Sequence, residues 1–106
     1  MDLANFLLAR IAEEERIALG VRPGPRVVRT GDRDVERFLT VWHPDRVLDE
    51  CTAKRAIVRE HQGFGGICGT CGVRRPEVGE RWPCRTLRLL AGPYAERPDF
   101  DEAWRA

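Results

Sequence analysis

Residues 61–84 read HQGFGGICGTCGVRRPEVGERWPC, and this stretch decides how the chain folds. Cys68 and Cys71 have the C-x-x-C spacing, which places two thiolates about 4 Å apart at one metal ion. Cys84 follows after twelve further residues, an ordinary separation for zinc ligands. The segment 62–83 is so rich in glycine and proline that we expect almost no regular structure in it. Such a segment depends on a bound metal for its order, because it cannot bury a core of its own.

The three cysteines need a fourth partner, because zinc prefers four ligands. The candidates are His61, Cys51 and His43. Cys51 and His61 lie ten positions apart on one expected helix, roughly 15 Å along its axis, so they cannot bind the same ion. We expect Cys51 to pack as a small apolar side chain and His43 to lie at the start of the helix. The sequence therefore predicts a structural Zn²⁺ site with three cysteines and one histidine: His61, Cys68, Cys71 and Cys84.

Two alternatives for these residues stay open. His61 could be an exposed histidine near a helix C-terminus, where a positive charge is favoured. Cys84 could be a partly buried thiol at the start of a helix.

Iron–sulfur and redox chemistry are weaker alternatives. Cys51 together with the other three cysteines could hold an iron–sulfur cluster, and the spacing of the first three cysteines resembles that of WhiB-like regulators. Those proteins have a shorter gap before the last cysteine and a Gly-Val-Trp-Gly-Gly turn that is missing here. Cys68 and Cys71 could also form a redox pair, but Gly72 and Pro76 leave no helix to lower the thiol pKa.

Regular helices are expected on both sides of the metal-binding loop. One runs from Pro44 to about Glu60, because proline is favoured in a first helical turn and apolar residues follow at helical spacing. The other runs from Pro83 to Ala91 and ends through a glycine cap at Gly92 and a proline stop at Pro93. The loop therefore joins two helices.

Two more helices are expected before the loop. The first covers Asp2–Leu19, with Asp2 as its N-cap and Gly20 as its stop. Its charged run Glu13–Arg16 is typical of a solvated face. The second is a short amphipathic helix over Asp34–Trp42 that should pack against its neighbours.

The aromatic residues of the C-terminal tail indicate that it docks onto the core. Asp99 or Asp101 should cap one last turn that carries Phe100 and Trp104. We expect the core to contain six apolar side chains from three helices: Phe6, Leu7, Leu48, Ile57, Leu87 and Leu90.

Composition limits the remaining possibilities. The chain has 106 residues and a net charge of +1, so its length favours one domain. No apolar run approaches the roughly 20 residues that span a bilayer, and acidic Asp2 does not fit an export signal. We therefore expect a cytoplasmic protein with no membrane contact and with cysteines that serve a metal. A P-loop, a nucleophile elbow and an H-E-x-x-H motif are all missing from the sequence, so we expect no enzyme.

The charge distribution leaves nucleic acid as an alternative partner. Within residues 62–92, five arginines against two glutamates give +3. Three thiolates and one Zn²⁺ carry a formal charge of about −1, and nearby arginines commonly neutralise such a centre. We favour that role over phosphate binding. The arginines concerned are Arg74, Arg75, Arg81, Arg85 and Arg88.

Two stretches carry a resemblance to a known family. Residues 54–61 (KRAIVREH) and 83–100 (PCRTLRLLAGPYAERPDF), together with Trp104, resemble a family of short proteins from actinobacteria and their phages that is known only as a domain of unknown function. Members carry a histidine and several cysteines in the matching region, which implies His61, Cys71 and Cys84 as ligands. The resemblance implies a small intracellular accessory protein of phage or integrated origin, and it supplies no activity.

The sequence as a whole predicts a mainly α fold, a small helical domain in which a zinc-knuckle loop joins two helices. The expected function is a zinc-binding, non-catalytic module that acts on a protein partner. A DNA-binding regulator is the alternative, and an iron–sulfur or thiol redox sensor is a lesser one. The single domain, residues 1–106, divides into a helix at 1–20, a loop and short helix at 21–43, a helix at 44–61, the zinc loop at 62–83, a helix at 83–91 and the docked tail at 92–106.

Overall fold

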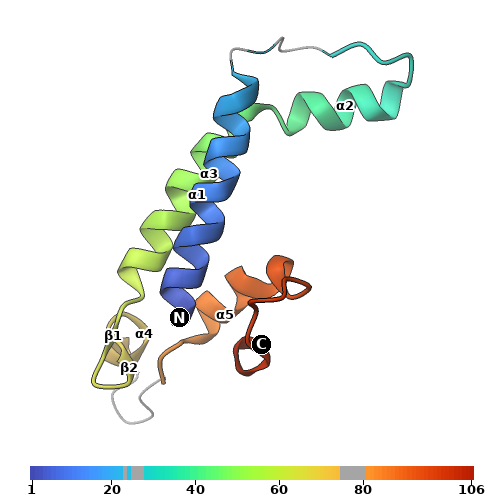
Figure 1. Cartoon of the computed structure of the whole chain (residues 1–106). Helices are drawn as coiled ribbons and strands as arrows, with labels where there is room; N and C mark the ends of the chain where they lie inside the picture. Colours follow the sequence, from blue (N-terminus) through green and yellow to red (C-terminus); the bar gives the residue numbers. More distant parts are fainter. Residues whose placement is uncertain (23, 25–27, 75–80) are drawn as a thin grey trace.

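Two long antiparallel helices form the body of the chain in the computed structural model (Figure 1). They are α1 (Leu3–Val21) and α3 (Pro44–Glu60), and the chain is mainly helical, as predicted. The structure describes residues 1–22, 24, 28–74 and 81–106, and the side chains at 73 and 74 are not described. The predicted loop at residues 23 and 25–27 therefore lies outside the described residues. None of the described helices is both long and apolar enough to cross a bilayer.

Short polar side chains fix where the two long helices begin. The carboxylate of Asp2 accepts a hydrogen bond from the Asn5 N–H at 2.8 Å, which satisfies a backbone donor that the first turn leaves free. His43 caps α3 in the same way, because its Nδ1 accepts from the Asp45 N–H at 3.1 Å. His43 thus lies at a helix start, as expected.

The first helix does not stop at Gly20, so that prediction is wrong. α1 continues to Val21, and Arg22 is the C-cap with an extended backbone. A glycine that ends a helix usually has a positive φ angle, in the left-handed region. Within the described residues, positive φ angles occur only at Gly31, Gly65 and Gly66.

The buried core lies at the end of the α1–α3 pair that carries the N-terminus (Figure 1). Phe6, Leu7 and Leu87 are buried as predicted. The predicted core residues Leu48, Ile57 and Leu90 are only partly buried. Side chains that complete the core include Leu3, Ile11, Val58 and Trp104.

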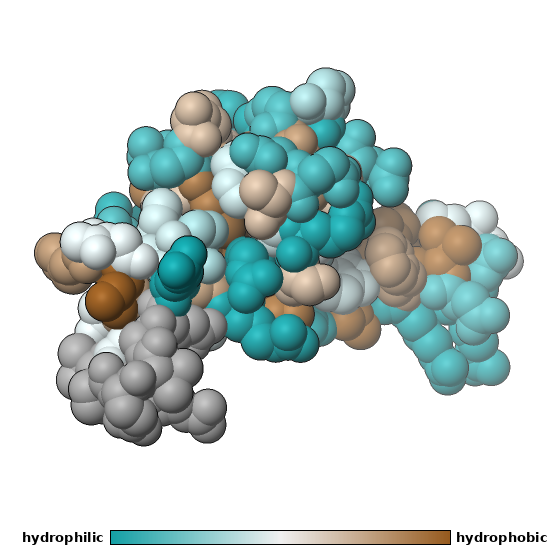
Figure 2. Space-filling model, turned by 90° about the horizontal axis from the view of Figure 1, so that it is seen from below, coloured by the Kyte–Doolittle hydropathy of each residue, from teal (hydrophilic) through white to brown (hydrophobic). Residues whose placement is uncertain are grey.

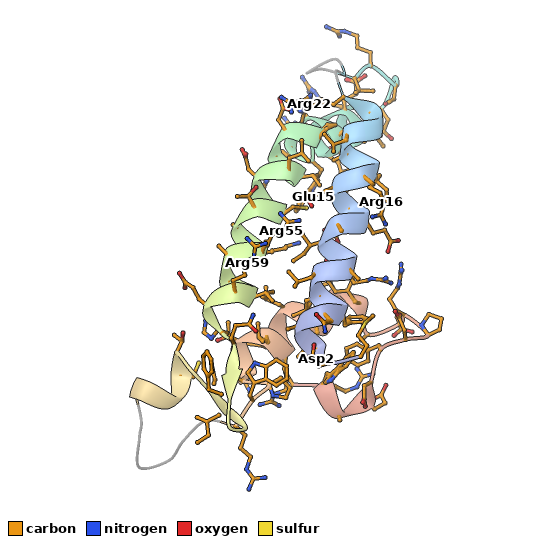
Figure 3. All side chains as sticks on the ribbon, turned by 60° about the vertical axis from the view of Figure 1, so that its left-hand side comes forward. Asp2, Glu15, Arg16, Arg22, Arg55 and Arg59 are labelled. Atoms are coloured by element: carbon orange, nitrogen blue, oxygen red, sulfur yellow. The ribbon has the colours of Figure 1, made fainter. Side chains whose placement is uncertain are left out.

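The acidic run of α1 is not a simply solvated face, contrary to expectation. Glu15 and Arg55 reach across from α1 and α3 toward one another, as Figure 3 shows, and form a two-pronged ion pair. Glu14 accepts a hydrogen bond from the Tyr94 hydroxyl, and Glu13 accepts one from Arg97 at 3.0 Å. These contacts join α1 to α3 and to the C-terminal segment. They follow from tertiary packing, which a charge pattern in one helix does not reveal.

The short helix α2 (Arg33–Val41) forms where predicted but does not pack as predicted. Asp32 caps it by accepting hydrogen bonds from the N–H groups of Asp34 and Val35. It projects across the end of the α1–α3 pair (Figure 1), and none of its residues is buried. Phe38 is 60% exposed, so the apolar face of α2 lacks a partner among the described residues.

The glycine-rich loop contains more regular structure than predicted. Strands β1 (Gly63–Phe64) and β2 (Ile67–Cys68) pair as an antiparallel hairpin, and the one-turn helix α4 (Cys71–Arg74) follows. Gly65 and Gly66 have positive φ angles of 59° and 80°, which favour glycine at the turn. Residues 75–80, where Pro76 and Gly79 lie, are outside the described part of the chain.

The last helix is shorter than predicted, and the tail docks as predicted. α5 covers Arg85–Ala91, and Gly92 keeps a right-handed backbone that continues into the 3₁₀ helix η1 (Gly92–Tyr94). The prediction that Gly92 ends the helix as a glycine cap is therefore wrong. The chain can continue into η1 because Pro93 occupies an early helical position, where no N–H is needed. Asp101 caps η2 (Glu102–Trp104), and the Trp104 ring lies 5.0 Å from that of Phe6.

We predict that Gly20→Ala stabilises the protein. Gly20 lies in the last turn of α1 with open space around a new Cβ, so alanine should add about 0.5 kcal/mol through helix propensity. Denaturant unfolding measures the change. Gly66→Ala is the matched control and should destabilise, because its φ of 80° strains any L side chain. A loss of stability with Gly20→Ala would instead mark Gly20 as a left-handed terminator.

Candidate metal centre

His61 lies where α3 ends, and the hairpin is fastened to this helix end. The last carbonyls of a helix lack intrahelical partners. The Glu60 carbonyl accepts from the Thr70 hydroxyl, and the Gln62 carbonyl accepts from the Gly69 N–H at 2.8 Å. One carbonyl at the end of α3 and one just beyond it therefore hold the hairpin near His61.

The C-x-x-C pair lies at the junction of the hairpin and α4. Cys68 is the second residue of β2, and Cys71 is the first residue of α4. The Cys71 N–H donates to the Cys68 sulfur, with 3.4 Å between the two atoms. Such a backbone hydrogen bond favours the thiolate form of Cys68, which is the form that binds metal.

Cys84 comes from the start of α5. It is the N-cap residue of this helix. Cys84 is completely buried. The packing of Leu87 and Ala91 in the core places this end of α5 beside the hairpin.

The four side chains converge on one point. The sulfur atoms of Cys68, Cys71 and Cys84 each lie 3.5 Å from the Nδ1 atom of His61. All four donor atoms lie within 4.8 Å of one another. The structure thus brings together all four residues that the sequence predicts as ligands, close enough to bind a metal ion.

The distances from the imidazole nitrogen to the three sulfurs fit tetrahedral zinc. A Zn–S distance of roughly 2.3 Å and a Zn–N distance of roughly 2.0–2.1 Å at tetrahedral angles place N and S about 3.6 Å apart. The three observed N–S distances of 3.5 Å match that value. Three thiolates and an imidazole are also the soft and borderline donors that zinc favours.

Burial and backbone donors set the protonation of the thiols. Burial, followed by the neighbouring Cys68 thiol, raises the pKa of Cys71 to about 12, and burial also raises the pKa of Cys84. Burial acts in the same direction at Cys68, but N–H groups of Cys71 and Thr70 outweigh it and lower the pKa to about 7. A coordinating thiol is deprotonated. Metal binding therefore has to displace protons from Cys71 and Cys84, and acid opposes it.

Cys51 lies apart from this cluster, as predicted. It is fully buried between α1 and α3, and its sulfur lies 3.9 Å from the Ile11 carbonyl oxygen. The ten positions to His61 span roughly 15 Å of one unbroken helix. The four cysteines are therefore not assembled for an iron–sulfur cluster in this fold. The expectation that no helix follows the C-x-x-C pair is wrong, because α4 begins at Cys71.

Sequence reasoning missed Trp82, which covers the site. Its indole N–H donates to the His61 carbonyl at 2.7 Å, and its backbone N–H donates to the Gly66 carbonyl. A Cβ at Gly63 would lie only 2.6 Å from the Trp82 ring. The sequence contained a signal for this contact, namely a tryptophan two residues before a ligand and a glycine two residues after another.

Of the predicted basic residues, three are described in full. Arg81 and Arg85 are exposed, and Arg88 is partly buried on α5. The side chain of Arg74 and all of Arg75 lie outside the described residues. Neutralisation of the thiolates by these arginines stays a prediction.

We predict that Cys84→Ser and Cys51→Ala differ sharply. Cys84→Ser removes one of four donors, so zinc content should fall and helical signal should be lost at temperatures where the native protein is folded. Cys51→Ala should cost only about 1 kcal/mol, because it leaves a small cavity. Zinc analysis and circular dichroism melts measure both variants. Equal damage from the two substitutions would refute this ligand assignment.

Comparison with known proteins gives one match. The model of a family of unknown function, DUF6221, matches residues 1–106, the whole chain. No curated protein and no solved structure matches.

Proposed function

Because the chain belongs to DUF6221, a family of unknown function, we propose its role from the site and surface: a zinc-stabilised, non-catalytic protein-interaction module. The observation that carries the proposal is the apolar face of α2, which no other described element covers. The proposal includes Zn²⁺ as the bound metal and an accessory role inside the cell, where free thiols persist. An actinobacterial or phage origin, implied by the resemblance, belongs to the same proposal.

The closed donor set supports a structural role for the metal. Catalytic zinc keeps a position open for water, whereas structural zinc is held by four protein ligands. Here three sulfurs and one nitrogen already give four donors. Cys68 and Cys84 are completely buried, which limits the approach of a substrate to their side of the ion.

The exposed face of α2 supports protein binding. Asp32 and Glu36 fix the start of the helix through hydrogen bonds to backbone N–H groups. These hydrogen bonds fix the first turn of α2, although none of its residues is fully buried. Val35, Phe38 and Trp42 are between 42% and 60% exposed. Exposed apolar patches of this kind mark interaction sites on soluble proteins.

One observation favours nucleic acid as a second candidate partner. Phe64 is 72% exposed at the hairpin, and Arg81 pairs with Ile67 of the adjacent strand. An exposed aromatic ring can stack on a base of single-stranded nucleic acid, and Arg81, on the other side of β2 from Phe64, can contact a backbone phosphate. In Figure 2 apolar surface is visible at this end of the molecule, beside the grey atoms. Binding to single-stranded DNA that weakens steeply with salt and is lost in Phe64→Ala would support this candidate.

We predict that a photo-crosslinking phenylalanine analogue at position 38 captures a protein in the cells that produce this chain. Phe38 is among the most exposed apolar residues of α2, so a partner seated there would touch it. The same analogue at Leu89, an exposed position on α5, is the matched control. The result expected is an adduct specific to position 38, detected by denaturing gel and mass spectrometry. Equal labelling at both positions would contradict the proposal.

A further inference from the structure

An apolar groove lies beside α2, at the end of the molecule far from the metal centre. It has a volume of about 200 Å³ and lies between the last turns of α1 and the start of α3, with Trp42 as one wall. We call it the Trp42 groove. Its lining residues are mainly apolar: Ile17, Ala18, Val21, Trp42, Pro44 and Val47, with Glu14 at one end.

Phe38 projects from α2 next to this groove. It precedes Trp42 by one helical turn, and the two ring centroids lie 6.2 Å apart. Arg46 stacks over the Trp42 ring, with its guanidinium carbon 4.6 Å from the centroid, and holds that wall in place. The exposed Phe38 ring and the Trp42 groove therefore lie next to one another on the same surface.

The Trp42 groove is large enough to hold the ring of a phenylalanine such as Phe38. A dry apolar cavity of roughly 150 Å³ accommodates a benzene molecule. The Trp42 groove, at about 200 Å³, can therefore accept one phenyl ring. Phe38 does not fill the groove of its own chain, because it is not among the lining residues and stays 60% exposed.

The charges around the surface favour a partner like itself. α2 carries Arg33 and Arg37 against Asp34 and Glu36, so its net charge is zero. At the groove edge Arg22 pairs with Asp45 at 2.9 Å. An acidic or basic partner would need an excess of one sign, whereas a self-complementary interface needs both signs.

The exposed area is also sufficient. Five large apolar side chains here are between 42% and 64% exposed: Ile17, Val21, Val35, Phe38 and Trp42. With full areas of roughly 150–250 Å² for the largest of them, they leave on the order of 500 Å² free. A standard interface buries about 800 Å² per partner, a little over half of it apolar. The surface can thus supply the apolar part of one standard interface.

We propose that this surface binds a second copy of the chain, with Phe38 of each copy seated in the Trp42 groove of the other. The arrangement has twofold symmetry and closes on itself, so it gives a dimer and not a filament. The inference rests on the proposed function as an interaction module and names the partner. Figure 2 shows apolar surface on the projecting part of the molecule that contains α2.

Sedimentation of the zinc-loaded full chain tests the proposal. The native protein should be mainly dimeric at a concentration of roughly 100 µM. Phe38→Asp and Ile17→Lys alter the projection and the groove separately, and each should weaken dimerisation about tenfold or more. Both positions are exposed, so circular dichroism and zinc content should stay native. Leu89→Asp, also at an exposed apolar position, should leave the dimer intact.

Mixing the two variants tests the reciprocal seating. In a mixed pair, the Ile17→Lys copy supplies an intact Phe38 to the intact groove of the Phe38→Asp copy. In the second contact, the negative charge that Phe38→Asp introduces in one copy lies beside the positive charge that Ile17→Lys introduces in the groove of the other copy. The 1:1 mixture should therefore dimerise more strongly than either variant does alone.

Three results would overturn the proposal: a native protein that stays monomeric, a Phe38→Asp variant that stays dimeric, or a mixture that gains no dimer. A monomeric native protein whose position 38 still crosslinks to a different protein would overturn the second copy as partner. That result would still support the proposed interaction function. The experiment therefore distinguishes failure of the dimer proposal from failure of the interaction function.

Discussion

The convergence of His61 with three cysteine sulfurs is the constraint on which the rest of the fold depends. Each sulfur lies 3.5 Å from the imidazole Nδ1, and the donors come from the end of α3, the hairpin, α4 and the start of α5. A single domain of 106 residues is only marginally stable, with a free energy of unfolding of about 5–15 kcal/mol. An ion bound by four segments would add to this free energy.

The cluster of His61 and three cysteines also joins the part of the chain that follows it to the core. Cys84 begins α5, and Leu87 and Ala91 of that helix pack in the core against α1. The tail then returns over Phe6 through Phe100 and Trp104, whose rings lie 6.1 Å and 5.0 Å from it. A disturbance at the sulfurs would therefore reach the N-terminal half of α1 through packed side chains.

The two ends of the α1–α3 pair differ in character. One end has the buried core and the donor cluster, while the other leaves Ile17, Val21 and Phe38 exposed. Glu15 and Arg55 join the helices between these ends. Stability is thus concentrated at one end, and apolar surface without a partner in the described chain is concentrated at the other.

Local sequence rules predicted what depends on local geometry. The rise of a helix separated Cys51 from His61, and caps such as Asp2 and Asp101 marked helix starts correctly. The rules failed where long-range contacts decide. Periodicity found α2 but could not show that its apolar face points to solvent, and glycine content concealed a hairpin that Trp82 and the α3 carbonyls hold.

The most direct test of the account is X-ray absorption at the metal edge, on protein purified without added metal. The account predicts one zinc per chain, with three sulfur neighbours at about 2.3 Å and one nitrogen at about 2.0–2.1 Å. Iron with short iron–iron scattering, or zinc with four sulfurs, would contradict it. Either result would bring Cys51 to the metal and require a different arrangement of α3.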